Sequence, residues 1–177
     1  MSTRLSPTSY LVLGLVAGMG PVTPYEMKQM VNASLGYFWS FPHSQLYAEP
    51  DRLVDAGLLR IEQEEAGRRR KRYSITEEGR AALVEWVSSP DTEPGETREP
   101  GLLKLFFGNM AEPEAVVALA HAQADRCREQ LAVYEGIEAA IAENRDFVYP
   151  LLTLRYGMVH TRAALEFWDD LAANPPE

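Results

Sequence analysis

The sequence has little of what a disulfide-bonded, metal-binding or membrane-spanning protein requires. Its 177 residues include one cysteine, Cys127, which excludes an internal disulfide and any zinc site built from several cysteines. The three histidines, His43, His121 and His160, lie too far apart to form a metal-ligand motif. The apolar run at residues 11–17 is too short to cross a bilayer. We therefore expect no metal, no cofactor and no membrane contact.

The motifs of common enzyme classes and of secretion are also missing. There is no glycine-rich phosphate loop and no G-x-S-x-G motif, so we assign no catalytic residue and predict that the chain is not an enzyme. No A-x-A cleavage site follows the apolar run, which favours a core helix over a secretory signal. A free thiol without a signal or a membrane span favours a cytoplasmic location.

Charge is distributed unevenly along the chain. A net charge of −9 excludes a protein that binds nucleic acid over its whole surface, although a local basic site remains compatible with it. Residues 1–88 hold 10 basic and 10 acidic residues, whereas residues 89–177 hold 7 and 16. Proline, glycine and small polar residues between the halves are typical of a linker. We predict a first domain at 1–88, a linker at 89–98 and a second domain at 99–177.

The first domain is predicted to contain three helices, a hairpin and a fourth helix. The first helix begins at Thr8 or Ser9, and the second has Thr23 as its N-cap with Glu26 completing a capping box. The third runs from near Pro42 to Gly57, and we expect Pro50 to kink it.

Strands at 58–62 and 72–75 flank a turn at Ala66-Gly67. Thr76 then caps a helix that buries Leu83, Trp86 and Val87. This order is that of a winged helix-turn-helix domain, in which the third helix enters the DNA major groove and the hairpin forms the wing.

The predicted wing carries a run of five consecutive cations. Such a run can bind phosphates, because neutralising them releases counterions. The alternative is a solvated turn whose charges prevent edge-to-edge strand pairing. At the tip of a wing we favour DNA contact by Arg68, Arg69, Arg70, Lys71 and Arg72.

The start of the third helix supplies the candidates for base recognition. A glutamine can bind adenine through both groups of its amide, and serine, histidine or tyrosine can reach phosphates or base edges. In the alternative interpretation Ser44 only caps the helix, His43 is merely exposed and Tyr47 packs on the second helix. The acidic residues Glu49, Asp51 and Asp55 should point away from DNA. The predicted contacts are His43, Ser44, Gln45 and Tyr47.

The second domain is predicted to be helical and to form a dimer. Apolar residues recur at steps of three and four along two segments, one after Pro113 and one after Asn144. Two such long seams favour a bundle formed by two chains, a dimer of antiparallel helix pairs, and the alternative is packing against the first domain. Cys127 is interpreted as a core residue rather than a redox sensor. The predicted dimer interface consists of Cys127, Leu131, Tyr134, Leu154, Met158, Leu165 and Trp168.

Several stretches together resemble the PadR family of bacterial transcriptional regulators, in its longer subfamily with a virulence-activator-type C-terminal domain. The resemblance rests on LVLGL and TPYEM near the N-terminus, on HSQLY followed by LVDAGLL, and on RYSITEEGR. It departs from the family at Glu49-Pro50-Asp51. It implies a mainly α fold, with three helices and a two-stranded wing followed by a helical dimerisation domain.

The resemblance also implies a function. Members are homodimeric repressors that bind inverted-repeat operators in double-stranded DNA, and the family tyrosines correspond here to Tyr25, Tyr47 and Tyr73. Tyr25 is therefore added to the predicted DNA contacts. Small aromatic or lipophilic effectors often release members from DNA. A pocket for one could involve Phe106, Phe107, Tyr156 and Trp168, although aromatic residues at helical spacing are more often core. The alternative function is a winged-helix adaptor that binds protein rather than DNA.

Overall fold

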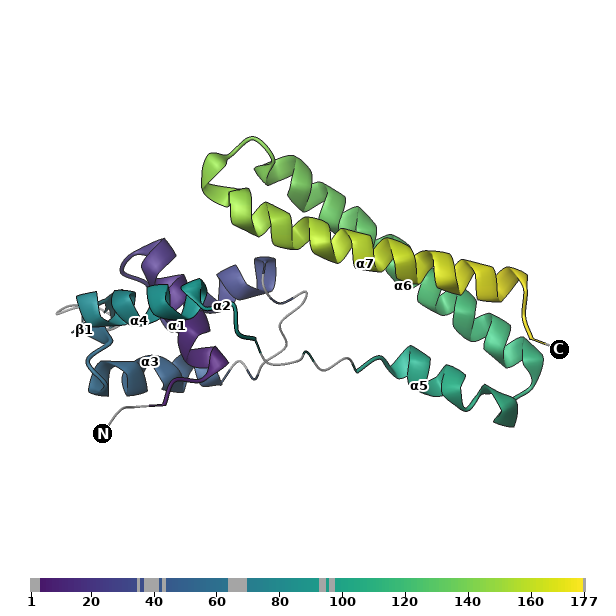
Figure 1. Cartoon of the computed structure of the whole chain (residues 1–177), viewed down its shortest axis with the longest axis horizontal. Helices are drawn as coiled ribbons and strands as arrows, with labels where there is room; N and C mark the ends of the chain where they lie inside the picture. The colour runs from purple at the N-terminus through teal and green to yellow at the C-terminus, as the bar shows by residue number, and fades with distance from the viewer. Residues whose placement is uncertain are drawn as a thin grey trace. The chain divides into compact units, whose positions relative to one another are not determined.

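The computed structural model describes residues 4–34, 36, 42, 44–63, 70–92, 95 and 98–176. The chain divides into two compact units, Met1–Glu93 and Pro94–Glu177 (Figure 1). The boundary between them falls inside the linker predicted at 89–98. In the part of the chain that is described, no helix is both long and apolar enough to traverse a bilayer.

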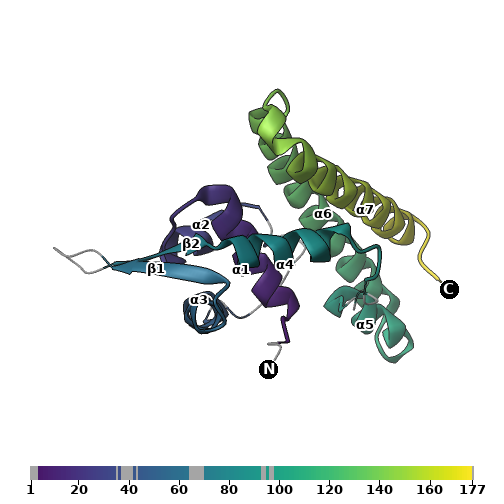
Figure 2. The same cartoon turned by 60° about the vertical axis from the view of Figure 1, so that its left-hand side comes forward.

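Unit 1 has the predicted order of three helices, a hairpin and a fourth helix. Its elements are α1 (Pro7–Met19), α2 (Pro24–Ala33), α3 (Gln45–Asp55), β1 (Leu59–Gln63), β2 (Lys71–Ile75) and α4 (Glu77–Ser88). The two strands pair antiparallel, with Leu59 opposite Ile75 and Gln63 opposite Lys71. Figure 2 shows this two-stranded ribbon beside α3. The predicted turn at Ala66-Gly67 lies outside the described residues.

Local capping fixes where the first two helices begin. The side chains of Thr23 and Glu26 form the predicted capping box of α2. For α1 the predicted start at Thr8 or Ser9 is wrong. Ser6 is the N-cap, because its Oγ accepts from the Ser9 N–H and the Ser9 Oγ accepts from the Ser6 N–H in return. Ser9 is therefore the third residue of the helix rather than its start.

The bounds of α3 and the packing of α4 also differ from the prediction. The third helix begins at Gln45 rather than near Pro42 and continues through the buried Pro50. Thr76 caps α4 as predicted, with the Gly79 N–H donating to its Oγ1. Three side chains of α4 were predicted to be buried, and of these only Leu83 packs against the core. Val87 is exposed, and Trp86 is half-exposed and stacks on Tyr10 with ring centroids 4.6 Å apart.

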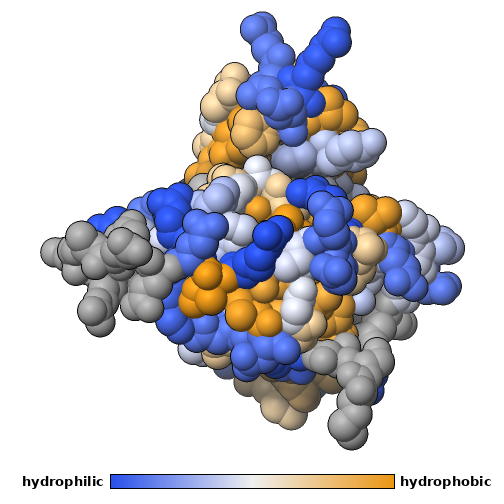
Figure 3. All heavy atoms as spheres, turned by 90° about the vertical axis from the view of Figure 1, so that its left-hand side faces the viewer, coloured by the Kyte–Doolittle hydropathy of each residue, from blue (hydrophilic) through white to orange (hydrophobic). Residues whose placement is uncertain are grey.

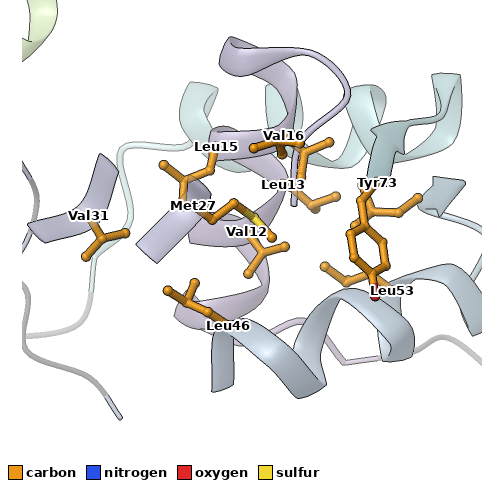
Figure 4. Packing of buried hydrophobic residues seen from close by; sticks show 11 residues of the cluster. Val12, Leu13, Leu15, Val16, Met27, Val31, Leu46, Leu53 and Tyr73 are labelled. Carbon is orange, nitrogen blue, oxygen red and sulfur yellow. The ribbon is translucent and has the colours of Figure 1, made fainter. Parts of the chain in front are cut away.

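The core of unit 1 is formed where α1, α2, α3 and β2 meet (Figure 4). Tyr73 of β2 is among its largest fully buried side chains, and its backbone forms a bridge with Val22 before α2. The fourth helix approaches this core closely at Gly79. A Cβ atom on Gly79 would lie 2.1 Å from the carbonyl oxygen of Leu58, so only glycine fits there. The labelled core side chains in Figure 4 are Val12, Leu13, Leu15, Val16, Met27, Val31, Leu46, Leu53 and Tyr73.

Unit 2 consists of a short helix followed by a long helical hairpin. Its elements are α5 (Pro100–Phe106), η2 (Gly108–Met110), α6 (Pro113–Ile141), η3 (Arg145–Phe147) and α7 (Val148–Ala173). The long helices α6 and α7 lie side by side (Figure 1) and run antiparallel. At one end Trp168 packs on Ala120 and Ala124, and farther along a Cβ atom on Gly157 would lie 3.4 Å from the ring of Tyr134. Ion pairs between Arg128 and Asp169 and between Arg155 and Glu138 also join the two helices.

This hairpin changes the interpretation of the predicted dimer seam. Tyr134, Met158 and Trp168 are buried within one chain, with 7%, 3% and 3% of their surfaces exposed. Assigning these three to contact with a second chain is therefore wrong. The remaining seam residues, Cys127, Leu131, Leu154 and Leu165, are half-buried. Burial also raises the pKa of the Cys127 thiol, as suits its interpretation as a core residue. Periodicity shows which residues are buried but not which chain supplies the neighbouring helix.

Candidate nucleic-acid interface

The first turn of α3 presents polar side chains to solvent. Ser44 is the N-cap residue, but its side chain makes no capping hydrogen bond and is exposed. The interpretation of Ser44 as a side-chain cap is therefore wrong. Tyr47 is half-exposed, and His43 lies outside the described residues. The described residues at this end of α3 are thus available to a partner.

A neighbouring helix orients the amide of Gln45. The hydroxyl of Thr8, in the first turn of α1, donates to Gln45 Oε1 at 2.9 Å. The Gln45 Oε1 atom has a second lone pair and the Nε2 group can still donate, so an amide held in this way keeps the acceptor and the donor that bind adenine through both groups. Thr8 was not among the predicted residues. It lies 37 positions before Gln45, and a contact between residues so far apart leaves no local pattern in the sequence.

The three tyrosines singled out by the resemblance occupy different environments. Tyr25 is exposed on α2, and its hydroxyl accepts a hydrogen bond from Gln29. Tyr47 is half-exposed on α3, whereas Tyr73 is 1% exposed and belongs to the core. Tyr25 and Tyr47 can therefore reach a partner, and Tyr73 supports the domain from inside.

The described cations of the wing differ in whether they have a partner within the protein. Arg70 is exposed just before β2, and Arg68 and Arg69 lie outside the described residues. The next two cations already have contacts within the protein. Lys71 Nζ binds the carboxylate of Asp51 at 2.8 Å, and the Arg72 guanidinium donates to the backbone oxygen of Pro21.

Alternation along β2 explains this division. Successive side chains of a strand point to opposite faces, so Lys71 faces α3 while Arg72 faces away from it. The hydrogen bond from Lys71, followed by that from Tyr73, holds the pKa of Asp51 below its ordinary value. Burial, followed by the Asp51 carboxylate, raises the pKa of the Tyr73 hydroxyl.

The acidic residues of α3 do not all point away from its exposed face. Asp51 and Asp55 follow Ser44 by about two and three helical turns, so they share one stripe of the helix with it. Glu49 is on another side and pairs with Arg52, which also donates to Ser9 of α1. The polar and acidic parts of the exposed stripe are therefore separated along the helix rather than around it.

The four residues predicted to line an effector pocket do not converge in one chain. Trp168 is buried between α6 and α7, whereas Phe106 and Tyr156 are largely exposed. Tyr156 precedes Trp168 by about 18 Å along α7 at the rise of an α-helix. Phe107 alone lies in a shallow groove between α5 and α6, beside Leu103, Val116 and Leu119. The predicted pocket is therefore wrong as a site within one chain.

Comparison with known families identifies both units. The model of the "Transcriptional regulator PadR-like family" matches residues 12–85, and that of "Virulence activator alpha C-term" matches residues 97–174. The chain belongs to the PadR-like family of transcriptional regulators. Its second unit is of the virulence-activator C-terminal type.

Individual PadR-like proteins show the same relationship. "Negative transcriptional regulator PadR" of Bacillus subtilis is 30% identical over 100 residues, covering 55% of this chain and about half, 54%, of that protein. The crystal structure of B. subtilis PadR in complex with operator DNA has a TM-score of 0.84 at 23% identity and covers 95% of this chain and 98% of that one.

The structure of the Vibrio cholerae virulence activator AphA has a TM-score of 0.70 at 27% identity, covering 93% and 95% of the two chains. These structures confirm the predicted fold of a winged helix-turn-helix unit followed by a helical unit. The homologues are transcriptional regulators, which confirms the prediction that this PadR-like chain is not an enzyme.

Proposed function

We propose that this PadR-like regulator is a homodimeric repressor that binds an inverted-repeat operator in double-stranded DNA. The observation that carries the proposal is the exposed first turn of α3, in a unit whose wing strand β2 is preceded by the exposed Arg70. Ser44 and Tyr47 are exposed there, and the exposed Gln45 has its amide held by Thr8. These groups match the acceptors on base edges and phosphates, and the wing supplies charge. The crystal structure of B. subtilis PadR in complex with operator DNA supports operator binding by this chain.

Exposed apolar side chains on unit 2 support dimerisation. Val148, Leu152, Tyr156 and Val159 recur at steps of three and four along α7, and each has 48% to 67% of its surface exposed. A stripe of this kind on a monomer is costly, and a second copy of the hairpin could bury it. Light scattering of the full chain should give twice the 19.8 kDa mass of one chain. Leu152→Glu with Val159→Glu should give a monomer of unchanged helicity, and a monomeric wild-type chain would contradict the proposal.

The names of the relatives support a proposal of repression and of release by an effector. The B. subtilis protein is named a negative regulator and has been crystallised with p-coumaric acid. We propose that a small aromatic acid releases this chain from DNA. Adding p-coumaric acid to the DNA complex tests this directly, because release should be saturable and should not occur with an aliphatic acid of the same charge. Loss of the complex with both acids would point to ionic strength instead.

Selection from a random library of duplexes tests the DNA-binding function. The full chain should enrich an inverted repeat whose half-sites lie about 34 Å apart, or a multiple of that distance. Arg69→Ala with Arg70→Ala should weaken binding to the enriched and random duplexes alike and make the salt dependence shallower by about two phosphate contacts. A winged-helix adaptor would enrich no sequence and would bind duplex DNA weakly at low salt.

A further inference from the structure

The carboxylate of Asp51 connects α3 to the second strand of the wing. Lys71 Nζ donates to its two oxygens at 2.8 and 3.0 Å, and the Tyr73 hydroxyl donates to Oδ1 at 2.8 Å. Lys71 and Tyr73 are alternate residues of β2, so both side chains lie on the face of the strand that meets α3. One acidic side chain thus receives three hydrogen bonds from a single strand.

The two donors of this cluster differ in their exposure. Tyr73 is fixed in the core with 1% of its surface exposed, so its hydroxyl holds the carboxylate in one place. The side chains of Lys71 and Asp51 are 47% and 48% exposed. The ion pair is therefore at the surface, where a DNA phosphate could compete with Asp51 for Lys71.

The position of Asp51 on α3 makes its charge relevant to DNA. Asp51 shares the exposed stripe that begins at Ser44, about two turns farther along the helix. An unpaired carboxylate on that stripe would repel the DNA backbone, and an unpaired Lys71 would attract it. The ion pair cancels both the repulsion by Asp51 and the attraction by Lys71 at this end of the exposed stripe.

We propose that Asp51 is a positioning residue that withholds Lys71 from the DNA backbone, so that the wing binds with one cation fewer than its sequence carries. The inference rests on the proposed DNA-binding function and goes beyond it by assigning a role to an acidic residue. Sequence-independent affinity grows with the number of phosphates that a protein neutralises. Pairing Lys71 with Asp51 therefore weakens binding to random DNA while Arg70 stays exposed beside the tip.

Salt titrations with a random-sequence duplex test the inference on the full-length chain. Asp51→Asn removes the charge but keeps an oxygen that can accept from Tyr73. The released Lys71 should add one phosphate contact and steepen the logarithmic salt slope by about 0.9. Between about 50 and 200 mM salt, the variant should therefore lose about 3- to 4-fold more affinity than the wild type loses. Asp51→Asn combined with Lys71→Met should restore the wild-type slope.

Asp55→Asn is the matched control, because it removes a negative charge from the same stripe without releasing a lysine. Its slope should equal that of the wild type. Equal steepening by Asp51→Asn and Asp55→Asn would show an effect of net charge alone and would overturn the inference, as would an unchanged slope for Asp51→Asn. Failure of the wild-type chain to bind any duplex would instead remove the proposed function together with this inference.

A measurement on the wild-type chain needs a variant only to assign one signal. The sequence has three lysines, Lys28, Lys71 and Lys104, so reductive methylation with a carbon-13 label gives three lysine signals besides that of the terminal amine. The Lys71 signal, assigned with Lys71→Arg, should not move when random duplex is added to the wild type. Movement of that signal on binding would show that Lys71 reaches DNA despite Asp51 and would refute the proposal.

Discussion

Replacing Gly79 by alanine should destabilise unit 1, although alanine normally stabilises a helix. Gly79 lies in the first turns of α4, where an alanine would ordinarily gain up to about 1 kcal/mol. Here a Cβ atom would lie 2.1 Å from the Leu58 carbonyl oxygen and 3.1 Å from Ile75 Cγ1. That oxygen accepts the Thr76 N–H at 3.1 Å, so it is not free to move away.

The size of the effect follows from the displacement that is needed. An ordinary contact begins at 3.4 Å, so helix and carbonyl must separate by about 1.3 Å. Overpacking of this kind typically costs about 1–3 kcal/mol and exceeds the gain in helix propensity. Gly79→Ala should therefore lower the free energy of unfolding by about 1–2 kcal/mol.

Urea unfolding followed by circular dichroism measures the effect, with Gly14→Ala as the matched control. Gly14 lies within α1, and a Cβ atom there would meet nothing within 4 Å. The control should raise the free energy of unfolding by about 0.5–1 kcal/mol. The same substitution thus has opposite signs at the two positions. A stabilised Gly79→Ala variant would refute the close approach of α4 to Leu58.

Three further predictions concern single side chains. The pKa of Asp51 is lowered in the folded state, so this carboxylate stabilises the fold above the ordinary pKa of 3.8. The stabilisation is lost as pH falls through the lower pKa of the folded state. The free energy of unfolding of Asp51→Asn should therefore depend less on pH in that range than that of the wild type. Trp168→Ala should leave a cavity against Ala120, cost about 3–5 kcal/mol and lower the melting temperature of the helical hairpin. Thr8→Val should release the Gln45 amide from α1 and weaken the base preference at one operator position, whereas Thr8→Ser should not, as sequencing of selected duplexes can show.

Local chemistry explains which parts of the fold could be predicted from the sequence. The caps at Thr23 and Thr76 are formed by residues within a few positions of each other, so the pattern is sufficient to place them. The start of α1 was harder to place, because Ser6 and Ser9 cap reciprocally and either serine fits the pattern. The order of helices and strands follows from such local signals and predicted the winged domain correctly.

Contacts between distant segments explain what the sequence did not show. The pairing of Lys71 with Asp51 spans 20 positions, and it removes a cation that the basic run appeared to offer. Strand alternation already places Lys71 and Tyr73 on one face, but it does not reveal which helix lies there. The sequence likewise predicts an antiparallel helix pair and a seam that includes Trp168, but it does not show that the pair within one chain already buries this tryptophan.

The ratio of affinities for the selected operator and a random duplex tests the central claim most directly, when it is measured for the wild type and for Gln45→Ala. If the first turn of α3 recognises bases, Gln45→Ala should cost about 1–3 kcal/mol on the operator and almost nothing on random DNA, so the ratio should fall. The salt slope should stay the same, because Gln45 carries no charge. An unchanged ratio, with equal losses on both duplexes, would contradict recognition by this end of α3.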